Sequence, residues 1–193
     1  MIMVKLWTRK QAECLERTRI LDLVQASDIS PYTGKTHDFV YIDTPDWVNM
    51  VPVTAQGEIV FIRQYRHGSQ SVTLEIPGGM VDPDEEPSRA AVRECLEETG
   101  FTAESVNSLG KLNPNPAIFK NGLHTFYGLV LPGEKTSHYS ETEHTEVEIL
   151  SIDHVRARLL DGTIDHALVC ATLWRFLDVL RDNGGLIATE VSI

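Results

Sequence analysis

Residues 78–101 read GGMVDPDEEPSRAAVRECLEETGF, a stretch in which carboxylates crowd between a glycine pair and a single glycine. Residues 87–99 within it have the pattern of a helix, because acidic residues precede them, apolar residues recur among them and Gly100 follows. The stretch therefore predicts a glycine turn, an acidic loop and a helix that ends at Gly100.

Three glutamates of this helix share one side of it. Glu94, Glu97 and Glu98 stand at i, i+3 and i+4, so their side chains project as one cluster. Like charges at this spacing repel one another. The cluster is either a solvated acidic surface or a set of oxygen ligands for a divalent cation.

The segments around this helix predict the rest of the fold. Short runs rich in Val, Ile, Phe and Tyr, separated by turn signals, predict β-strands. They are residues 19–27, 37–44, 47–54, 58–66, 71–77, 124–130 and 146–152. Apolar residues at helical spacing over 164–180 predict a second helix that faces the core. The fold class is therefore α/β, a mixed sheet with helices on its faces.

Composition excludes several classes of protein. The 193 residues carry a formal net charge of -11 and no cluster of Lys and Arg, which argues against a nucleic-acid surface. Cys14, Cys95 and Cys170 are far apart and lack metal-type spacing, which predicts reduced thiols in a cytoplasm-like compartment. We expect no membrane association, since no signal-peptide pattern is present and no apolar run approaches the roughly 20 residues that span a bilayer.

The spacing of the glycines and charges follows a known pattern. In one-letter form it is G-x5-E-x7-R-E-U-x-E-E-x-G-U, where U is a bulky apolar residue, and Cys95 takes the first apolar position. Its members are Gly79, Glu85, Arg93, Glu94, Cys95, Glu97, Glu98, Gly100 and Phe101. The pattern resembles the Nudix hydrolase signature at every defined position. The resemblance implies an α/β/α sandwich with a mixed sheet.

The resemblance also assigns roles within the signature. It implies that Glu94, Glu97 and Glu98 bind Mg²⁺ or Mn²⁺, whose charge would relieve the repulsion among them. The backbone carbonyl of Gly78 would be a further ligand, because glycine permits a close approach and unusual dihedral angles. Arg93 is expected to pair with Glu85 and to hold the acidic loop against the helix.

Cys95 is expected to be an inert thiol in the core.

The sequence on either side of the signature indicates the class of substrate. The stretches RQYRHG, LEIPGGMVD and NPNPAIFKNGLHTFYGLV resemble the branch of ADP-ribose pyrophosphatases and nucleoside diphosphate sugar hydrolases, and Pro116 follows Gly100 by sixteen residues. The expected reaction is metal-dependent hydrolysis of a nucleoside diphosphate sugar, such as ADP-ribose or GDP-mannose, to nucleoside monophosphate and sugar phosphate. Other diphosphates (a dinucleoside polyphosphate or an RNA 5′ end) and a non-catalytic ligand-sensing module remain alternatives.

Five residues are candidates for substrate binding. Arg66 ends a predicted strand and is expected to grip the diphosphate, with Arg63 as a second candidate. Glu75 would hydrogen-bond the substrate or support the metal ligands. An aromatic side chain, Trp47 or Tyr32, would stack on the nucleobase. The alternatives are a surface salt bridge for Arg66, an ordinary strand carboxylate for Glu75 and core packing for Trp47.

A second acidic run, SETEHTEVEIL, precedes the strand at 146–152. It resembles the loop that supplies the general base in this branch, which makes Glu141 or Glu143 the expected base and Glu143 a further metal ligand. If this run is only a solvated loop, the base would be Glu97 or Glu98.

Histidines show no metal-type pairing, which favours surface or core roles for them. They are His67, His124, His138, His144 and His166.

The N-terminal residues complete the expected organisation. Residues 1–45 form a strand segment and residues 46–193 form the Nudix domain. In the resembled branch such a segment pairs with a second subunit, so a homodimer is expected.

Overall fold

A computed structural model describes residues 3–133 and 144–184 of the chain. The described residues form two compact units. The N-terminal unit combines residues up to Asp46 with residues 113–122, and the larger unit takes the remainder. The segment 113–122 joins the N-terminal unit because Ile42 pairs with it: the Ile42 N–H donates to the Ile118 carbonyl at 2.7 Å. No pattern in the sequence indicated this.

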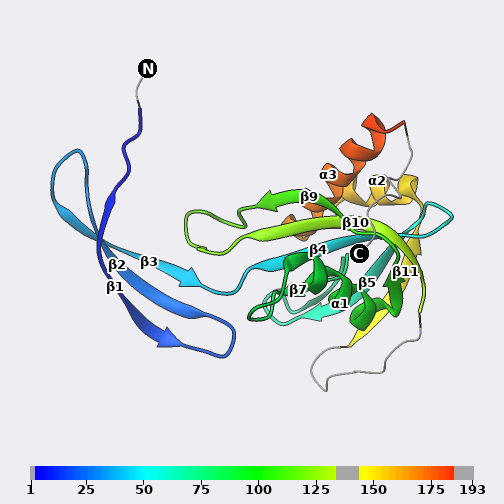
Figure 1. The fold of residues 1–193 in the computed structure, drawn as a ribbon, viewed down its shortest axis with the longest axis horizontal. Helices are drawn as coiled ribbons and strands as arrows, with labels where there is room; N and C mark the ends of the chain where they lie inside the picture. Colours follow the sequence, from blue (N-terminus) through cyan, green and yellow to red (C-terminus); the bar gives the residue numbers. More distant parts are fainter. Residues whose placement is uncertain (1–2, 134–143, 185–193) are drawn as a thin grey trace. The chain divides into compact units, whose positions relative to one another are not determined.

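The N-terminal unit contains a three-stranded antiparallel sheet in the order β1–β2–β3 (Figure 1). The strands are β1 (Thr8–Arg17), β2 (Asp22–Ile29) and β3 (Thr36–Asp43). The sequence predicted β2 and β3 but not β1. Every residue of β1 is exposed, so this edge strand lacks the apolar alternation that marks a half-buried strand.

The larger unit is built on an eight-stranded mixed sheet. Its central path runs β11–β5–β4–β10–β8, while β6 pairs with β5, β7 with β4 and β9 with β10. The β4–β10 pair is parallel and the others are antiparallel. The strands are β4 (Trp47–Val53), β5 (Ile59–Arg66), β6 (Ser71–Glu75), β7 (Gly78–Met80), β8 (Phe101–Ala103), β9 (Asn107–Leu112), β10 (Leu123–Pro132) and β11 (Thr145–Leu150).

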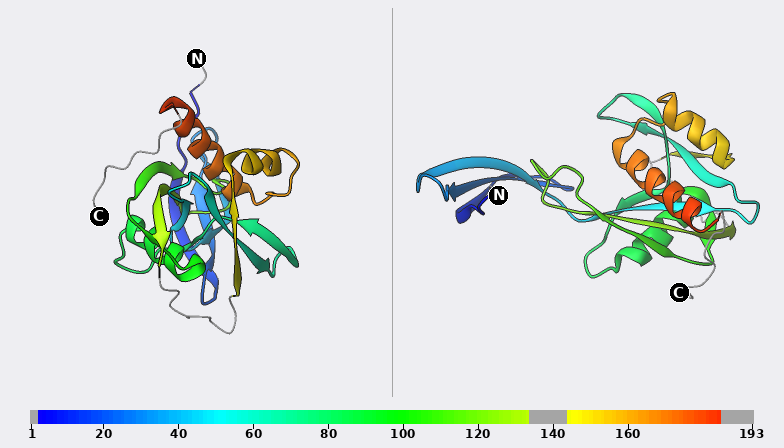
Figure 2. Two further views of the ribbon diagram at one scale, coloured as in Figure 1. Left: turned by 90° about the vertical axis from the view of Figure 1, so that its right-hand side faces the viewer. Right: turned by 90° about the horizontal axis from the view of Figure 1, so that it is seen from above.

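Helices cover both faces of this sheet, as the sequence predicted (Figures 1 and 2). Helix α1 (Pro87–Thr99) packs on one face, and α2 (Ile152–Leu160) and α3 (Ala167–Asp182) pack on the other. Strand β4 is buried on both sides: Val48 and Met50 join the core under α1, while Val51 and Val53 join the core under α2 and α3. Its continuous apolar run reflects this double burial.

Helix α2 and strand β9 were not predicted. The sequence analysis continued the strand at 146–152 through Ile152, but Ser151 begins a helix there by accepting a hydrogen bond from the His154 backbone N–H. Only Val155 is fully buried in α2, but Ile152 and Leu159 pack against the same core, so the sequence carries a helical apolar spacing at 152, 155 and 159 that went unrecognised.

The predicted helix over 164–180 is α3, which begins later, at Ala167. Among the described residues, no helix combines the length and the apolar character needed to cross a membrane.

Candidate active site

The glycine pair sits in β7, which lies antiparallel to β4, with Gly78 opposite Asn49 and Gly79 opposite Val48. A side chain at Gly78 would collide with the Val48 carbonyl oxygen and come within 2.6 Å of Asn49 Oδ1. Neither glycine has a positive φ. The close approach expected from the sequence is therefore present, but the unusual dihedral angles are not, because the pair adopts ordinary strand geometry.

Helix α1 places its glutamates beside this pair. Ala90, Ala91 and Cys95 are fully buried against the sheet, which turns the acidic side of the helix away from the core. Gly100 ends the helix in the left-handed conformation, with φ of 75°, and donates to the Leu96 carbonyl. Burial raises the pKa of the Cys95 thiol to about 12, so the expected inert core thiol is present.

Two contacts join the helix to the glycine pair. The Gly78 N–H donates to Glu98 Oε2 at 3.0 Å. A side chain at Gly79 would overlap the Glu94 carboxylate, so only glycine leaves room for that group. Burial raises the pKa of Glu98 to about 8, and the charge of Glu94 adds to the effect, while the Gly78 N–H opposes it. The signature thus concentrates negative charge where solvent screens it poorly.

Arg93 organises the acidic residues. Its guanidinium donates to both oxygens of Glu85, with Nε at 3.0 Å and Nη2 at 2.9 Å, which is the predicted pairing. Nη1 also donates to Glu94 at 2.9 Å and to Glu97 at 3.3 Å, and Nη2 donates to the Met80 carbonyl at 3.1 Å. Arg93 therefore ties the acidic loop, the helix and β7 together.

The donor set suits a hard divalent cation. Glu94, Glu97 and Glu98 offer carboxylate oxygens within one helical turn, and a cation would stabilise the charged form of Glu98, which burial disfavours and the nearby Glu94 disfavours further. Within residues 3–133 and 144–184 no three such groups already converge into a ligand set, and Arg93 Nη1 lies between Glu94 and Glu97. A bound cation would supply Lewis-acid stabilisation of phosphate charge.

A cavity of about 590 Å³ opens beside β7. Gly78, Gly79 and Met80 line one part of it, and Arg66 and Glu75 line another. The structure thus brings the glycine pair and these two predicted substrate-binding residues to one cavity.

The Arg66 guanidinium forms a two-point ion pair with Glu75, with Nε to Oε1 at 2.7 Å and Nη2 to Oε2 at 2.8 Å. Thr73 Oγ1 also donates to Glu75 Oε1 at 2.6 Å. Burial alone would raise the pKa of Glu75, but the hydrogen bonds from Arg66 and Thr73 outweigh it and hold the pKa below its ordinary value of 4.5. Arg66 and Glu75 were predicted as separate substrate-binding residues, and nothing in the sequence indicated that they pair with each other.

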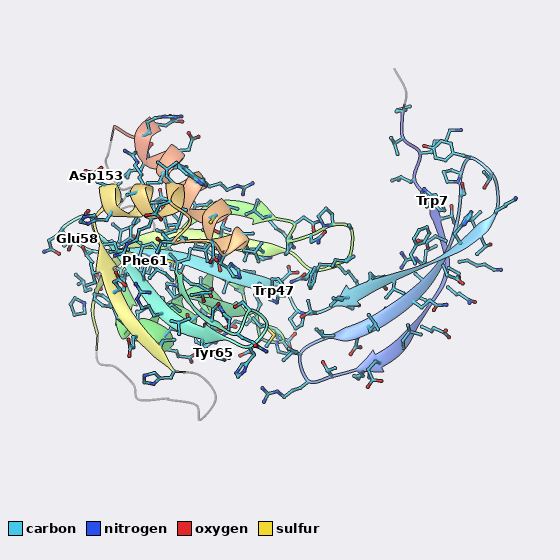
Figure 3. All side chains as sticks on the ribbon, turned by 180° about the vertical axis from the view of Figure 1, so that it is seen from behind. Trp7, Trp47, Glu58, Phe61, Tyr65 and Asp153 are labelled. Carbon is cyan, nitrogen blue, oxygen red and sulfur yellow. The ribbon has the colours of Figure 1, made fainter. Side chains whose placement is uncertain are left out.

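Of the other predicted substrate-binding residues, Trp47 lines the cavity and Arg63 does not. Trp47 begins β4 (Figure 3), and it is part of the cavity lining. Arg63 lies three residues before Arg66, so strand alternation turns it to the opposite face of the sheet. There its Nη2 pairs with Glu148 at 2.8 Å, and Arg158 of α2 binds the same carboxylate. The described residues that line the cavity do not include Arg63.

Tyr32 belongs to the N-terminal unit, where its hydroxyl accepts a hydrogen bond from the Lys5 N–H at 2.9 Å. Glu141 and Glu143, the expected general bases, lie outside the described residues.

Several polar residues of the cavity were not among the predicted site residues: Asn49, His67, Ser69, Ser71, Thr73, Asp165 and His166. Asn49 is buried and donates to Thr172 Oγ1 of α3 at 3.2 Å. His67 and His166 were assigned surface or core roles because they have no metal-type spacing. Asp165 and His166 lay inside the predicted helix over 164–180, whereas the structure places both before α3, which begins at Ala167.

A glycine pair packed against an acidic helix, beside a cavity, defines a class of α/β sandwich protein whose clustered carboxylates suit a divalent cation. The chain belongs to the NUDIX domain family, whose model matches residues 43–172.

Proteins with similar sequences and structures agree with this family membership. The ADP-ribose pyrophosphatase of Bacillus subtilis is 28% identical over 136 residues, which cover 70% of this chain and 73% of the relative. The ADP compounds hydrolase NudE of Escherichia coli is 35% identical over 77 residues, covering 40% and 41%. A crystal structure of an ADP compounds hydrolase superposes with a TM-score of 0.82 at 22% identity, covering 96% of this chain and 100% of that one, which shows a shared fold.

Proposed function

We propose that this protein hydrolyses the diphosphate bond of nucleoside diphosphate sugars, such as ADP-ribose, to nucleoside monophosphate and sugar phosphate. The observation that carries the proposal is the hydrogen bond from the Gly78 N–H to Glu98, which joins the acidic helix to the cavity wall. Relatives named for action on ADP-ribose and ADP compounds support the substrate class.

Divalent cations, Mg²⁺ or Mn²⁺, would be held by Glu94, Glu97, Glu98 and the Gly78 carbonyl, with Glu143 as a further ligand. When bound, they would neutralise the diphosphate and lower the pKa of a coordinated water. Carboxylate and carbonyl oxygens are the donors that such hard cations prefer. The family as a whole depends on divalent metal, whereas the choice of ion is a proposal for this chain.

Side chains of the protein would position the helix, bind the substrate and accept the proton. Arg93, held by Glu85, positions the acidic helix against β7. Arg66 would donate to the diphosphate from the cavity wall, and Trp47 would stack on the nucleobase. Glu141 or Glu143 would take the proton from the attacking water, with Glu97 or Glu98 in that role if neither does.

The N-terminal unit would form a homodimer. This unit exposes several large apolar side chains, including Trp7, Leu15, Phe39 and Val40, with exposed fractions between 41% and 48%. The Trp7 and Phe39 rings pack edge to face with centroids 5.4 Å apart, and exposed apolar surface where such side chains gather is typical of an interaction site. A cytoplasmic location would agree with the free Cys14, Cys95 and Cys170.

A panel of diphosphates assayed with Mg²⁺ tests the proposed reaction. ADP-ribose and ADP- or GDP-linked hexoses should be the best substrates by kcat/KM, and each should yield nucleoside monophosphate and sugar phosphate in equal amounts. A clear preference for nucleoside triphosphates, dinucleoside polyphosphates or RNA 5′ ends would contradict the proposal. Tight binding of these compounds without turnover would identify a sensor.

A further inference from the structure

The cavity wall formed by the start of α3 has no part in the proposed chemistry. Asp165 and His166 are adjacent in the chain and both line the cavity, as does Leu168 two residues further along. His166 is half-buried and lines the same cavity as the Arg66–Glu75 ion pair.

One hydrogen bond determines which atoms of His166 are available to a ligand. His166 is the N-cap of α3, and its Nδ1 accepts a hydrogen bond from the Val169 backbone N–H at 3.4 Å. An imidazole nitrogen that accepts carries no proton, so the proton of the neutral ring is on Nε2. The Nε2–H group is then the donor that the ring keeps for the cavity.

The charges around this donor select what it can bind. The charged groups among the described lining residues are Arg66, Glu75 and Asp165, and Arg66 and Glu75 already pair with each other. Asp165 therefore leaves this wall negative, which disfavours a phosphate beside it. A sugar hydroxyl suits both groups, since it can accept from His166 Nε2–H and donate to the Asp165 carboxylate. Ser69, Ser71 and Thr73 add hydroxyl groups to the same cavity.

We propose that His166 and Asp165 form a subsite that recognises the hydroxyls of a sugar ring in the substrate. This inference rests on the proposed function and deepens it, because it separates a sugar-binding wall from the glycine pair and acidic helix where the diphosphate would react. The sugar is either the nucleoside ribose or the second sugar, which share this chemistry.

A serine at position 166 separates the two roles of the histidine. Serine is among the best N-cap residues, so His166→Ser keeps the helix cap while it removes the Nε2–H donor. The melting temperature should stay within about 2 °C of the wild-type value. Because the lost hydrogen bond contributes equally to ground-state and transition-state binding, KM for ADP-ribose should rise roughly 5-fold with kcat nearly unchanged. Asp165→Asn, which can still accept a hydrogen bond, should have a smaller effect in the same direction.

Three probes identify the group that is bound. ADP-ribose carries both sugars, the methyl ester of ADP lacks the second sugar, and the methyl ester of dideoxy-ADP lacks the hydroxyls of both. His166→Ser should raise KM for ADP-ribose and leave KM for the dideoxy probe within about twofold. The methyl ester of ADP then assigns the subsite, since an effect that persists with it places the nucleoside ribose there. The matched control is His154→Ser, which removes an imidazole from the first turn of α2 and should change no KM value.

Two results would overturn the subsite. An unchanged KM for ADP-ribose in His166→Ser means that the ring does not bind substrate, and an equal increase with all three probes means that it acts on the diphosphate or on the fold. If the wild-type protein hydrolyses none of the probes, the proposed function fails, and calorimetric binding of ADP-ribose without metal still tests the subsite. In that case, equal affinity of wild type and His166→Ser, or no binding to either, refutes it.

Discussion

The ion pair between Arg66 and Glu75 makes the role of Arg66 testable. The Glu75 side chain is 3% exposed and the Arg66 side chain 42% exposed. Arg66→Ala would leave a buried carboxylate with Thr73 as its remaining hydrogen-bond donor. Breaking a fully buried pair costs about 3–5 kcal/mol, and because water reaches this one from the arginine side we expect about 2 kcal/mol. For a chain of this size the melting temperature should fall by roughly 4–8 °C.

The double variant Arg66→Ala/Glu75→Gln separates stability from binding. A neutral glutamine removes the buried charge, so the free energy of unfolding should return to within about 1 kcal/mol of the wild-type value. Substrate binding should not recover, because a charge-assisted hydrogen bond to phosphate is worth about 1.5–3 kcal/mol. KM for ADP-ribose should therefore stay at least about 10-fold above wild type in both variants. Denaturant unfolding and steady-state kinetics measure the two quantities.

A return of KM to the wild-type value in the double variant would refute this reasoning. Arg66 would then act only as the structural partner of Glu75, the salt-bridge alternative that the sequence left open. The pH dependence of unfolding supplies an independent check. Because the folded pKa of Glu75 is lowered, the pair's stabilisation is complete above about pH 4.5 and is lost as the pH falls through the folded pKa. The stability difference between wild type and Arg66→Ala should therefore shrink below pH 4.5.

Further predictions concern the metal ligands, the base and the glycine pair. Glu98→Gln should lower turnover by about 10²-fold or more, and EDTA should abolish activity, so full turnover in EDTA would exclude metal dependence. Glu141→Gln or Glu143→Gln should lower kcat by roughly 10²- to 10⁴-fold with little change in KM, and near-normal kcat in both would move the base to the helix. Gly78→Ala should cost about 3 kcal/mol of stability, because its added methyl meets the backbone of β4. Gly68→Ala, where the added methyl meets nothing within 4 Å, is the matched control and should unfold like the wild type.

Local sequence patterns predicted much of the fold. The helix from Pro87 to Thr99 was predicted with its observed bounds, because Gly100 marks its end and apolar spacing marks its buried face. Central strands such as β4 and β5 were predicted from apolar runs that burial on both faces requires. Strand β1 was missed for the opposite reason, since every residue of it is exposed. Helix α2 was missed because it is only nine residues long and begins directly after β11, so the predicted strand ran on through Ile152 and the helical spacing of Ile152, Val155 and Leu159 went unrecognised.

The sequence by itself determined the acidic cluster and the pairing of Arg93 with Glu85. Both depend on helical periodicity and on a short loop, so residue spacing is sufficient to specify them. Only the tertiary structure decided which other side chains meet at the cavity. Arg66 reaches it and Arg63 does not, because their odd separation along one strand sends them to opposite faces of the sheet. His166 lies about ninety residues from Gly78 in the chain, and it reaches the same cavity because α3 packs on β4, whose Asn49 bonds Thr172 of α3 and pairs with Gly78 of β7.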